Sequence, residues 1–278
     1  MSTPPTSARA TSTAADRREW DLTVRGTRIR MQAAGSGDPL LYLHGSGDPG
    51  LWTPALTALA ETHRVYRPDH PGFGGSADRD GIDSIHELAF FYLDVLDEVG
   101  AGQAVLVGSS LGGWIAADLA TIEPRRVSGL VLVAAAGLRA GTTGRDTFAA
   151  SPVEVAGLLY HDEEYRAAAV RQAAGVESDP EGFERYLRNR MATAHLTWNP
   201  YMHDPKLPER LHRITAPTLV LWGEHDALLP AAHAHRWAEL LPEARIEIVE
   251  GAGHLPLVEK TDAALAVLRS FLEGGTRP

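Results

Sequence analysis

The stretch that decides the fold is Gly108-Ser109-Ser110-Leu111-Gly112, which lies between an apolar run and a helix-like segment. Residues 104–107 are typical of a buried strand, and residues 113–122 favour a helix. A sharp turn from strand to helix strains the backbone of its middle residue, and a Cβ at either flanking glycine would clash. The pattern predicts a nucleophile elbow with Ser110 at its tip. Because glycines also flank serines in ordinary turns, this interpretation depends on partner residues elsewhere.

Short apolar runs without alternation recur along the chain, separated by helix-like segments. Strands that crossover helices bury on both faces have this composition. Residues 21–24 and 27–32 alternate instead, which predicts a hairpin at the sheet edge. We therefore expect an α/β fold whose mostly parallel sheet has helices on both faces and an antiparallel N-terminal edge. The expected buried strands are 40–43, 65–66, 104–107, 130–133, 218–222 and 246–249, and the expected helices are 52–61, 85–99, 111–122, 231–241 and 259–272.

The strand pattern stops between residues 139 and 212, where Ala-, Glu- and Arg-rich helical segments replace it. A structureless loop of that length is unusual in a compact domain. We predict a helical lid at 139–212, inserted between two parts of one core at 17–138 and 213–278. Residues 1–16 are rich in Ser, Thr, Pro and Ala and are expected to form a disordered tail.

The composition excludes several classes of function. Lys and Arg number 26 against 36 Asp and Glu, a net charge of −10, which argues against nucleic acid and anionic membranes as partners. The chain has no cysteine, so disulfides and thiolate chemistry are excluded, and a reducing compartment fits. No apolar stretch suits a signal peptide or a membrane span. We expect a cytoplasmic protein with a small-molecule partner, and the oligomeric state stays open.

Candidate catalytic partners for the serine follow two later predicted strands. A serine hydroxyl is a poor nucleophile at neutral pH and needs a base that an acid orients. Ser110, Asp226 and His254 occur in this order and would meet at the carboxyl ends of parallel strands. We interpret His254 as the general base and Asp226 as the acid that orients its ring. Glu224 competes for the second role, and we favour Asp226 because it lies further beyond the strand end.

Acyl transfer also needs hydrogen-bond donors aimed at the developing oxyanion. Leu111 is the first residue of the expected helix after the elbow, so its N–H has no intrahelical acceptor. We expect the second donor to be the N–H of Ser46, in the loop His44-Gly45-Ser46-Gly47 after an apolar run. His44 itself is interpreted as structural.

Five motifs, in their order along the sequence, resemble those of the α/β-hydrolase superfamily, and they extend over nearly the whole chain past residues 1–16. The resemblance implies an eight-stranded, mainly parallel sheet whose helical lid follows the sixth strand. It also carries over Ser110, Asp226 and His254 as a catalytic triad, with Ser46 and Leu111 as oxyanion donors. The motifs are His44-Gly45-Ser46-Gly47, Asp69-His70-Pro71-Gly72-Phe73-Gly74-Gly75-Ser76, Gly108-Ser109-Ser110-Leu111-Gly112, Gly223-Glu224-His225-Asp226 and Gly253-His254.

The residue types at these motifs narrow the reaction. Epoxide hydrolases and haloalkane dehalogenases of the superfamily carry Asp at the elbow, so Ser110 argues against both. The loop after His44 is similar to that of meta-cleavage-product hydrolases, which break carbon–carbon bonds. The chain departs from those enzymes at Ser109, typically Asn, and at Leu255, typically Trp. We expect Ser109 and Leu255 to contact the substrate, together with Trp198 of the predicted lid.

We expect a serine hydrolase without cofactor or metal that cleaves an apolar carboxylic ester, lactone or related acyl compound through an acyl-enzyme on Ser110. The alternatives are a carbon–carbon bond hydrolase of the meta-cleavage-product type and a non-catalytic receptor or scaffold on the same fold. Arg188 or Arg190 can bind a substrate carboxylate, although a solvated helix face also explains both. A metal site is disfavoured because its best candidates, His233 and His235, would point in different directions on a helix.

Overall fold

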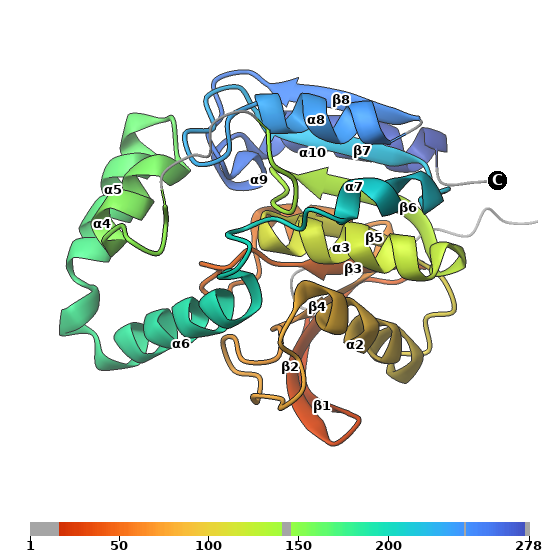
Figure 1. Cartoon of the computed structure of the whole chain (residues 1–278), viewed down its shortest axis with the longest axis horizontal. Coiled ribbons are helices and arrows are strands. Elements are labelled where there is room, and N and C mark those ends of the chain that lie inside the picture. Colours follow the sequence, from red (N-terminus) through yellow and green to blue (C-terminus); the bar gives the residue numbers. More distant parts are fainter. Residues whose placement is uncertain (1–16, 141–145, 242, 276–278) are drawn as a thin grey trace, which may run out of the picture.

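A sheet of eight strands forms the centre of the computed structural model, which describes residues 17–140, 146–241 and 243–275 (Figure 1). The predicted tail at 1–16 lies outside the described residues. The strands are β1 (Arg18–Val24), β2 (Thr27–Ala34), β3 (Asp38–Leu43), β4 (His63–Pro68), β5 (Ala104–Ser109), β6 (Val127–Val133), β7 (Thr218–Gly223) and β8 (Ala244–Val249). They lie in the order β1-β2-β4-β3-β5-β6-β7-β8. β2 pairs antiparallel with β1 and β4, and the pairs from β4 across to β8 are parallel.

Helices cover both faces of the sheet. The helices of the described ranges are α1 (Pro54–Leu59), α2 (Ile85–Glu98), α3 (Leu111–Ile122), α4 (Pro152–Leu159), α5 (Glu163–Ala174), α6 (Pro180–Thr197), α7 (Leu207–Arg210), α8 (Ala232–Leu240), α9 (Pro256–Glu259) and α10 (Thr261–Gly275), with short 3-10 turns η2 (Pro124–Arg126), η3 (Val176–Ser178) and η4 (Leu211–Arg213). One core lies under α2, α3 and α8, and the other lies under α1, α9 and α10. This arrangement confirms the predicted fold class. None of the helices in the described ranges is long and apolar enough to cross a membrane.

Successive residues of the central strands belong to opposite cores. Leu41 and Leu106 pack beneath α2 and α3, whereas Leu40 and Val105 pack toward α1 and α10. Each of these side chains is at most 2% exposed, and burying one such side chain contributes roughly 1.5–3 kcal/mol. A strand buried on both faces needs apolar residues at every position, which explains the unalternating runs in the sequence.

Helices α4 to α7 form an insertion between β6 and β7. In Figure 1, α4, α5 and α6 form an arch at one side of the sheet. The two ends of the insertion are joined where Gly137 and His203 form a parallel bridge. The Gly137 N–H donates to Met202 O at 3.3 Å, and the Asp204 N–H donates to Gly137 O at 3.0 Å. The chain therefore leaves the core and returns to it at one point. Residues 141–145 of the predicted lid lie outside the described residues.

Capping side chains set where α4 and α5 of the insertion begin. Ser151 accepts a hydrogen bond from the Glu154 N–H at 3.3 Å, and Glu154 accepts one from the Ser151 N–H at 2.9 Å. This reciprocal pair satisfies donors that the first turn of α4 would otherwise leave unpaired. The Asp162 side chain caps α5 by accepting from the Glu164 N–H at 3.0 Å.

The start of α3 lies directly against the carboxyl ends of β3 and β5. An ideal Cβ on Gly112 would lie 2.0 Å from the carbonyl oxygen of Leu43, and one on Gly108 would lie 2.3 Å from that of Gly112. Both distances are far below van der Waals contact, and both involve backbone atoms that cannot move independently. Only glycine fits at these two positions, as the elbow pattern predicts.

We predict that Gly112→Ala lowers the free energy of unfolding by about 1–3 kcal/mol, the usual cost of overpacking a close-packed site. Gly157→Ala in α4 is the matched control, because a Cβ there meets nothing within 4 Å. The control should raise the free energy of unfolding by about 0.5–1 kcal/mol through helix propensity. Urea unfolding of the three proteins measures both effects. A Gly112→Ala protein as stable as the wild type contradicts the close approach.

Candidate active site

Ser110 occupies the single-residue turn between β5 and α3. Its backbone has φ 52° and ψ −113°, a conformation that is costly for a residue with a side chain. Four backbone hydrogen bonds hold it there, one of them a bond of 3.4 Å from the Trp114 N–H to the Ser110 carbonyl. The Ser110 N–H donates to Val133 O at 2.8 Å, and the Ser110 carbonyl accepts from the N–H groups of Ala136 and Gly113 at 3.0 Å each. The end of β6 and the first turn of α3 thus fix the strained residue from both sides.

Asp226 and His254 form a buried pair in the loops after β7 and β8. The Nδ1 of His254 lies 2.7 Å from Asp226 Oδ2, and the two side chains are 2% and 0% exposed. The other oxygen of Asp226 accepts from the N–H groups of Leu228 and Leu229 at 2.9 and 2.8 Å. Because a carboxylate only accepts, Nδ1 carries the proton in this contact, and Nε2 of the neutral ring is a proton acceptor.

The neighbours of Asp226 in the same loop face other groups. Glu224, the competing acid, accepts from the Gly251 N–H at 3.0 Å. The ring of His225 packs on that of His161, with 3.9 Å between the centroids. Of the two carboxylates considered, Asp226 is therefore the one in contact with His254.

Ser110 and the Asp226–His254 pair lie at the same edge of the sheet. They follow β5, β7 and β8, and in the sheet only β6 separates β5 from β7. Among the described residues, no hydrogen bond joins the Ser110 hydroxyl to the His254 ring. Such bonds are often long in proteins without substrate and shorten when the substrate binds.

The loop after β3 lies against the elbow. An ideal Cβ on Gly45 would lie 3.4 Å from Ser110 Cβ. Ser46 and Gly47 are the central residues of a turn that the Asp48 N–H closes by donating to Gly45 O at 3.2 Å. Within the described ranges, the N–H groups of Ser46 and Leu111 donate to no protein acceptor. An oxyanion hole requires two such donors beside the nucleophile, and this role of Ser46 and Leu111 stays a prediction.

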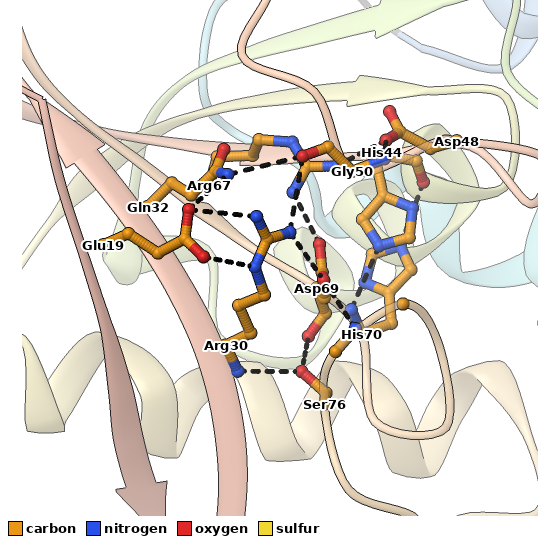
Figure 2. A network of polar contacts seen from close by, with 12 residues as sticks. Glu19, Arg30, Gln32, His44, Asp48, Gly50, Arg67, Asp69, His70 and Ser76 are labelled. Carbon is orange, nitrogen blue, oxygen red and sulfur yellow. Dashed lines mark hydrogen bonds and ion pairs between the residues drawn. The ribbon is translucent and has the colours of Figure 1, made fainter. Parts of the chain in front are cut away.

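A network of buried charges supports this loop from behind (Figure 2). The Arg67 side chain is 1% exposed, donates to Asp69 Oδ1 at 2.6 Å and also binds Asp48. Arg30 donates to the second oxygen of Asp69 at 3.2 Å and to Glu19 at 2.7 Å. A buried charge is tolerated only when it is paired, and removal of one partner typically costs about 3–5 kcal/mol. Apart from Asp69, which begins one of the five motifs, no local pattern in the sequence marks these residues, because their pairing depends on strands that meet only in the folded chain.

Two stacked histidines continue the network toward α2. The His44 and His70 ring centroids lie 3.7 Å apart. The His70 N–H donates to His44 Nε2 at 3.0 Å, so the other ring nitrogen of His44 carries the proton and donates to Gly45 O at 2.8 Å. Burial, with a smaller contribution from the charge of Arg67, lowers the pKa of His44 to about 4. Burial also lowers the pKa of His70 well below its ordinary value. Both rings are neutral at physiological pH, which fits the structural role predicted for His44.

The insertion contacts the loop that carries His254. The His254 N–H donates to Leu159 O, at the end of α4, at 2.9 Å. The buried carboxylate of Glu259 accepts from the Gly253 N–H at 2.5 Å and from the N–H of Asp162 in the insertion. Glu259 therefore joins the insertion to the histidine loop, a role that no pattern in the sequence indicated.

Two arginine side chains of α6 anchor the insertion: Arg188 binds it to the core, and Arg190 joins two segments of the insertion itself. Arg188 donates to Gly72 O at 3.1 Å and to Ser76 O at 2.7 Å. Arg190 donates to Phe148 O at 2.6 Å. The sequence left a substrate carboxylate and a solvated helix face open as roles for these arginines, and in the structure both guanidinium groups bind backbone carbonyls instead.

The three residues predicted to contact a substrate lie in different surroundings. Ser109 ends β5 and is 5% exposed. Leu255 is half-buried directly before α9. Trp198 is 64% exposed at the end of α6, with its ring 5.6 Å from that of Phe148. Contact of these side chains with a substrate stays a prediction.

Comparison with known proteins relates most of the chain to one family. The model of the alpha/beta hydrolase family matches residues 40–267. A dihydrolipoyllysine-residue acetyltransferase component of an acetoin cleaving system from Cupriavidus necator is 31% identical over an alignment of 268 residues, and the match covers 90% of this chain and 68% of that protein. A protein of the same description from Pseudomonas putida is 30% identical, and the match covers 85% of this chain and 64% of that protein's length.

An esterase and a solved hydrolase structure are similar over nearly their full lengths. The pimeloyl-[acyl-carrier protein] methyl ester esterase of Aliivibrio salmonicida is 29% identical, over 89% of this chain and 97% of the esterase. The structure of 2-hydroxy-6-oxo-6-phenylhexa-2,4-dienoate hydrolase from Rhodococcus sp. strain RHA1 superposes with a TM-score of 0.77 at 22% identity, covering 93% of this chain and 99% of that one. At that identity the second likeness concerns the fold alone.

The lowered pKa values of His44 and His70 predict that stability decreases toward acid. Unfolded histidine takes up a proton near its ordinary pKa of 6.5, whereas folded His44 does so only near about 4. Between these values the unfolded state binds more protons, so the free energy of unfolding falls as the pH is lowered from 6.5 to 4. Each such histidine contributes up to about 1.4 kcal/mol per pH unit. Urea unfolding at several pH values should give a shallower slope for His44→Gln than for the wild type, and equal slopes would exclude His44 as a source of the effect.

Proposed function

Because this chain belongs to the alpha/beta hydrolase family, we propose that it is a cofactor-independent serine hydrolase that cleaves a carboxylic ester, lactone or related acyl compound. The observation that carries the proposal is the buried 2.7 Å contact between His254 and Asp226 at the sheet edge that also bears the strained Ser110. Packing alone does not require an ionisable pair at this place, since burial of charged and polar groups costs free energy. A serine with an oriented base is the requirement for nucleophilic acyl transfer.

In the proposed reaction, Ser110 Oγ attacks the carbonyl carbon of the substrate while His254 Nε2 takes the hydroxyl proton. The carbonyl electrons move to the oxygen, which the N–H groups of Ser46 and Leu111 stabilise. The intermediate collapses, the bond to the alcohol breaks, and His254 returns the proton to the leaving oxygen. Asp226 stabilises the charged imidazole throughout. A water molecule then attacks the acyl group on Ser110 in the same way and releases the carboxylic acid.

The choice of an ester or lactone has two supports. The Ser110 hydroxyl forms an acyl intermediate at a carbonyl carbon, which suits esters better than the alkyl-transfer reactions that employ an Asp nucleophile. The similarity to an esterase of methyl esters points to the same class. A carbon–carbon bond hydrolase remains the second candidate, because the loop after His44 is similar to that of meta-cleavage-product hydrolases while Ser109 and Leu255 depart from their pattern.

We predict that Ser110→Ala lowers kcat for an activated ester by at least ~10³-fold, because the nucleophile is lost. The melting temperature should stay unchanged, since the Ser110 backbone bonds remain. Ser270→Ala, an exposed serine on α10, is the matched control and should keep wild-type activity. Mass spectrometry after treatment with a fluorophosphonate should show one adduct on the wild type and none on Ser110→Ala. A wild type that neither reacts with the reagent nor hydrolyses an ester would favour a non-catalytic receptor.

The substrate class can be tested with p-nitrophenyl esters of graded acyl length, aliphatic lactones and a meta-cleavage dienoate. We expect turnover of esters or lactones that depends on Ser110 and little turnover of the dienoate. Initial rates with the wild type and Ser110→Ala separate enzymatic from spontaneous hydrolysis. Ser110-dependent cleavage of the dienoate alone would replace the ester proposal by the carbon–carbon bond hydrolase.

A further inference from the structure

The turn that contains Ser46 has few bonds of its own to fix its orientation. Its only internal backbone bond in the described structure is the 3.2 Å contact from the Asp48 N–H to Gly45 O. Gly45 lies against Ser110, so a small rotation of the turn changes the direction of the Ser46 N–H relative to the serine. A donor must point at the oxyanion to within a fraction of an ångström to be effective. The groups that hold Asp48 therefore decide where this donor points.

Asp48 is held from two sides. Its side chain binds the guanidinium of Arg67 in the core and accepts from the Gly50 N–H at 2.7 Å (Figure 2). Its backbone carbonyl accepts a hydrogen bond of 3.2 Å from Nδ2 of Asn189. Arg67 belongs to β4, whereas Asn189 belongs to α6 of the insertion. One anchor is thus part of the core, and the other is present only when the insertion is docked.

Asn189 makes a second hydrogen bond, so its whole amide is engaged. The amide oxygen accepts from the Gly74 N–H, in the loop after β4, at 2.9 Å. The side chain is 5% exposed, and a buried amide is tolerated because its groups are paired. The amide fits only one way round, since Asp48 offers an acceptor and Gly74 offers a donor. Asn189 bridges the loops after β3 and β4.

The preceding residue on the same helix provides a comparison. Arg188 binds Gly72 O, Ser76 O and the carboxylate of Asp78, which all belong to the loop after β4. Arg188 therefore docks the same helix on the core without touching the turn that contains Ser46. Loss of either side chain weakens docking, but only loss of Asn189 releases the Asp48 carbonyl.

We propose that Asn189 is a positioning residue for the oxyanion hole, which makes the orientation of the Ser46 N–H depend on the docking of α6. In this arrangement the insertion acts as a lid whose docked state completes the catalytic site. The inference rests on the proposed function, since an oxyanion hole has a role only if acyl transfer occurs.

Three variants test the proposal. Asn189→Asp has the same shape and still accepts from the Gly74 N–H, but it offers no donor to the Asp48 carbonyl. Asn189→Ala removes the bonds to Asp48 and Gly74 without adding a charge. It replaces the first variant as the test if the charge of Asn189→Asp prevents folding. Arg188→Met removes the neighbouring anchor and is the control for general loosening of α6. Thermal melting of each protein reports how much docking is lost.

We expect both Asn189 variants to lower kcat for a p-nitrophenyl ester about tenfold or more with KM changed less than about threefold, because the lost interaction acts in the transition state. Labelling by a fluorophosphonate should slow in parallel. The ratio of kcat for an oxygen ester to kcat for the matching thionoester should be smaller in the Asn189 variants than in the wild type. Sulfur is a poorer acceptor for the oxyanion donors, so the thionoester loses less when a donor is misplaced. Arg188→Met should keep kcat within about threefold, whatever its melting temperature.

Wild-type kcat in both Asn189 variants would overturn the inference, and so would an equal loss of kcat in Arg188→Met. Either result leaves the proposed function standing, because the wild type still reacts. A wild type inert toward the ester and the fluorophosphonate refutes the proposed function and the inference with it. The behaviour of the wild type thus tells the two failures apart.

Discussion

The chain reverses from β5 into α3 at a single residue, Ser110. The rest of the site depends on how closely the backbones of β3, β5 and α3 approach one another at this turn. Because Gly108 and Gly112 have no Cβ, the first turn of α3 can pack directly on the ends of β3 and β5. This contact puts the Leu111 N–H beside the serine and brings the loop after β3 against the same point. The strain at Ser110 is sustained because neighbouring strands over-determine its backbone. A steric constraint on two glycines thus places a side chain, two donors and a supporting loop together.

The polar groups behind the loop after β3 explain how irregular backbone is held firmly at the edge of an apolar sheet. Arg67 and Asp69 lie at the end of β4 and are nearly inaccessible to solvent. Their charges are compensated within the core, and their bonds reach the loops after β3 and β4 at once. The neutral histidine pair adds bonds of fixed direction between the same loops. These interactions contribute less to net stability than their number suggests, because burial of charges is costly. Their effect is geometric, since each loop has few positions that satisfy all the partners.

Much of the fold could be predicted from the sequence because hydrophobic periodicity reports which faces are buried. The parallel strands, the antiparallel edge and the order of the elements followed from that signal. Boundaries were less accurate. The expected strand at 65–66 is only the centre of β4, because a buried Arg67 pairs with carboxylates and interrupts the apolar run. Helix α1 begins later than expected, at the Pro54 that follows its Thr53 cap.

The residues of the site likewise fall into two groups, those that a local sequence pattern marks and those that only the folded structure brings together. Ser110, Asp226 and His254 each lie within three residues of a glycine at or just after the end of a strand, which is a local signal. Asn189 lies 141 positions from its partner Asp48, within a helix whose sequence gives no local reason to mark an amide. Glu259 binds Asp162 across 97 positions. Contacts of this kind follow from tertiary packing, so no reading of a single sequence identifies them.

The paired backbone at Gly137 and His203 makes the insertion a module with one neck. Because the chain departs and returns at the same place, residues can be added to or removed from the segment beyond the neck without changing the spacing of β6 and β7. The segment beyond the neck and the strands that carry Ser110, Asp226 and His254 are then encoded in separable stretches of the gene. Exchange of the segment between relatives is a small step for evolution, provided that the new segment keeps an amide where Asn189 stands and a backbone that meets the histidine loop.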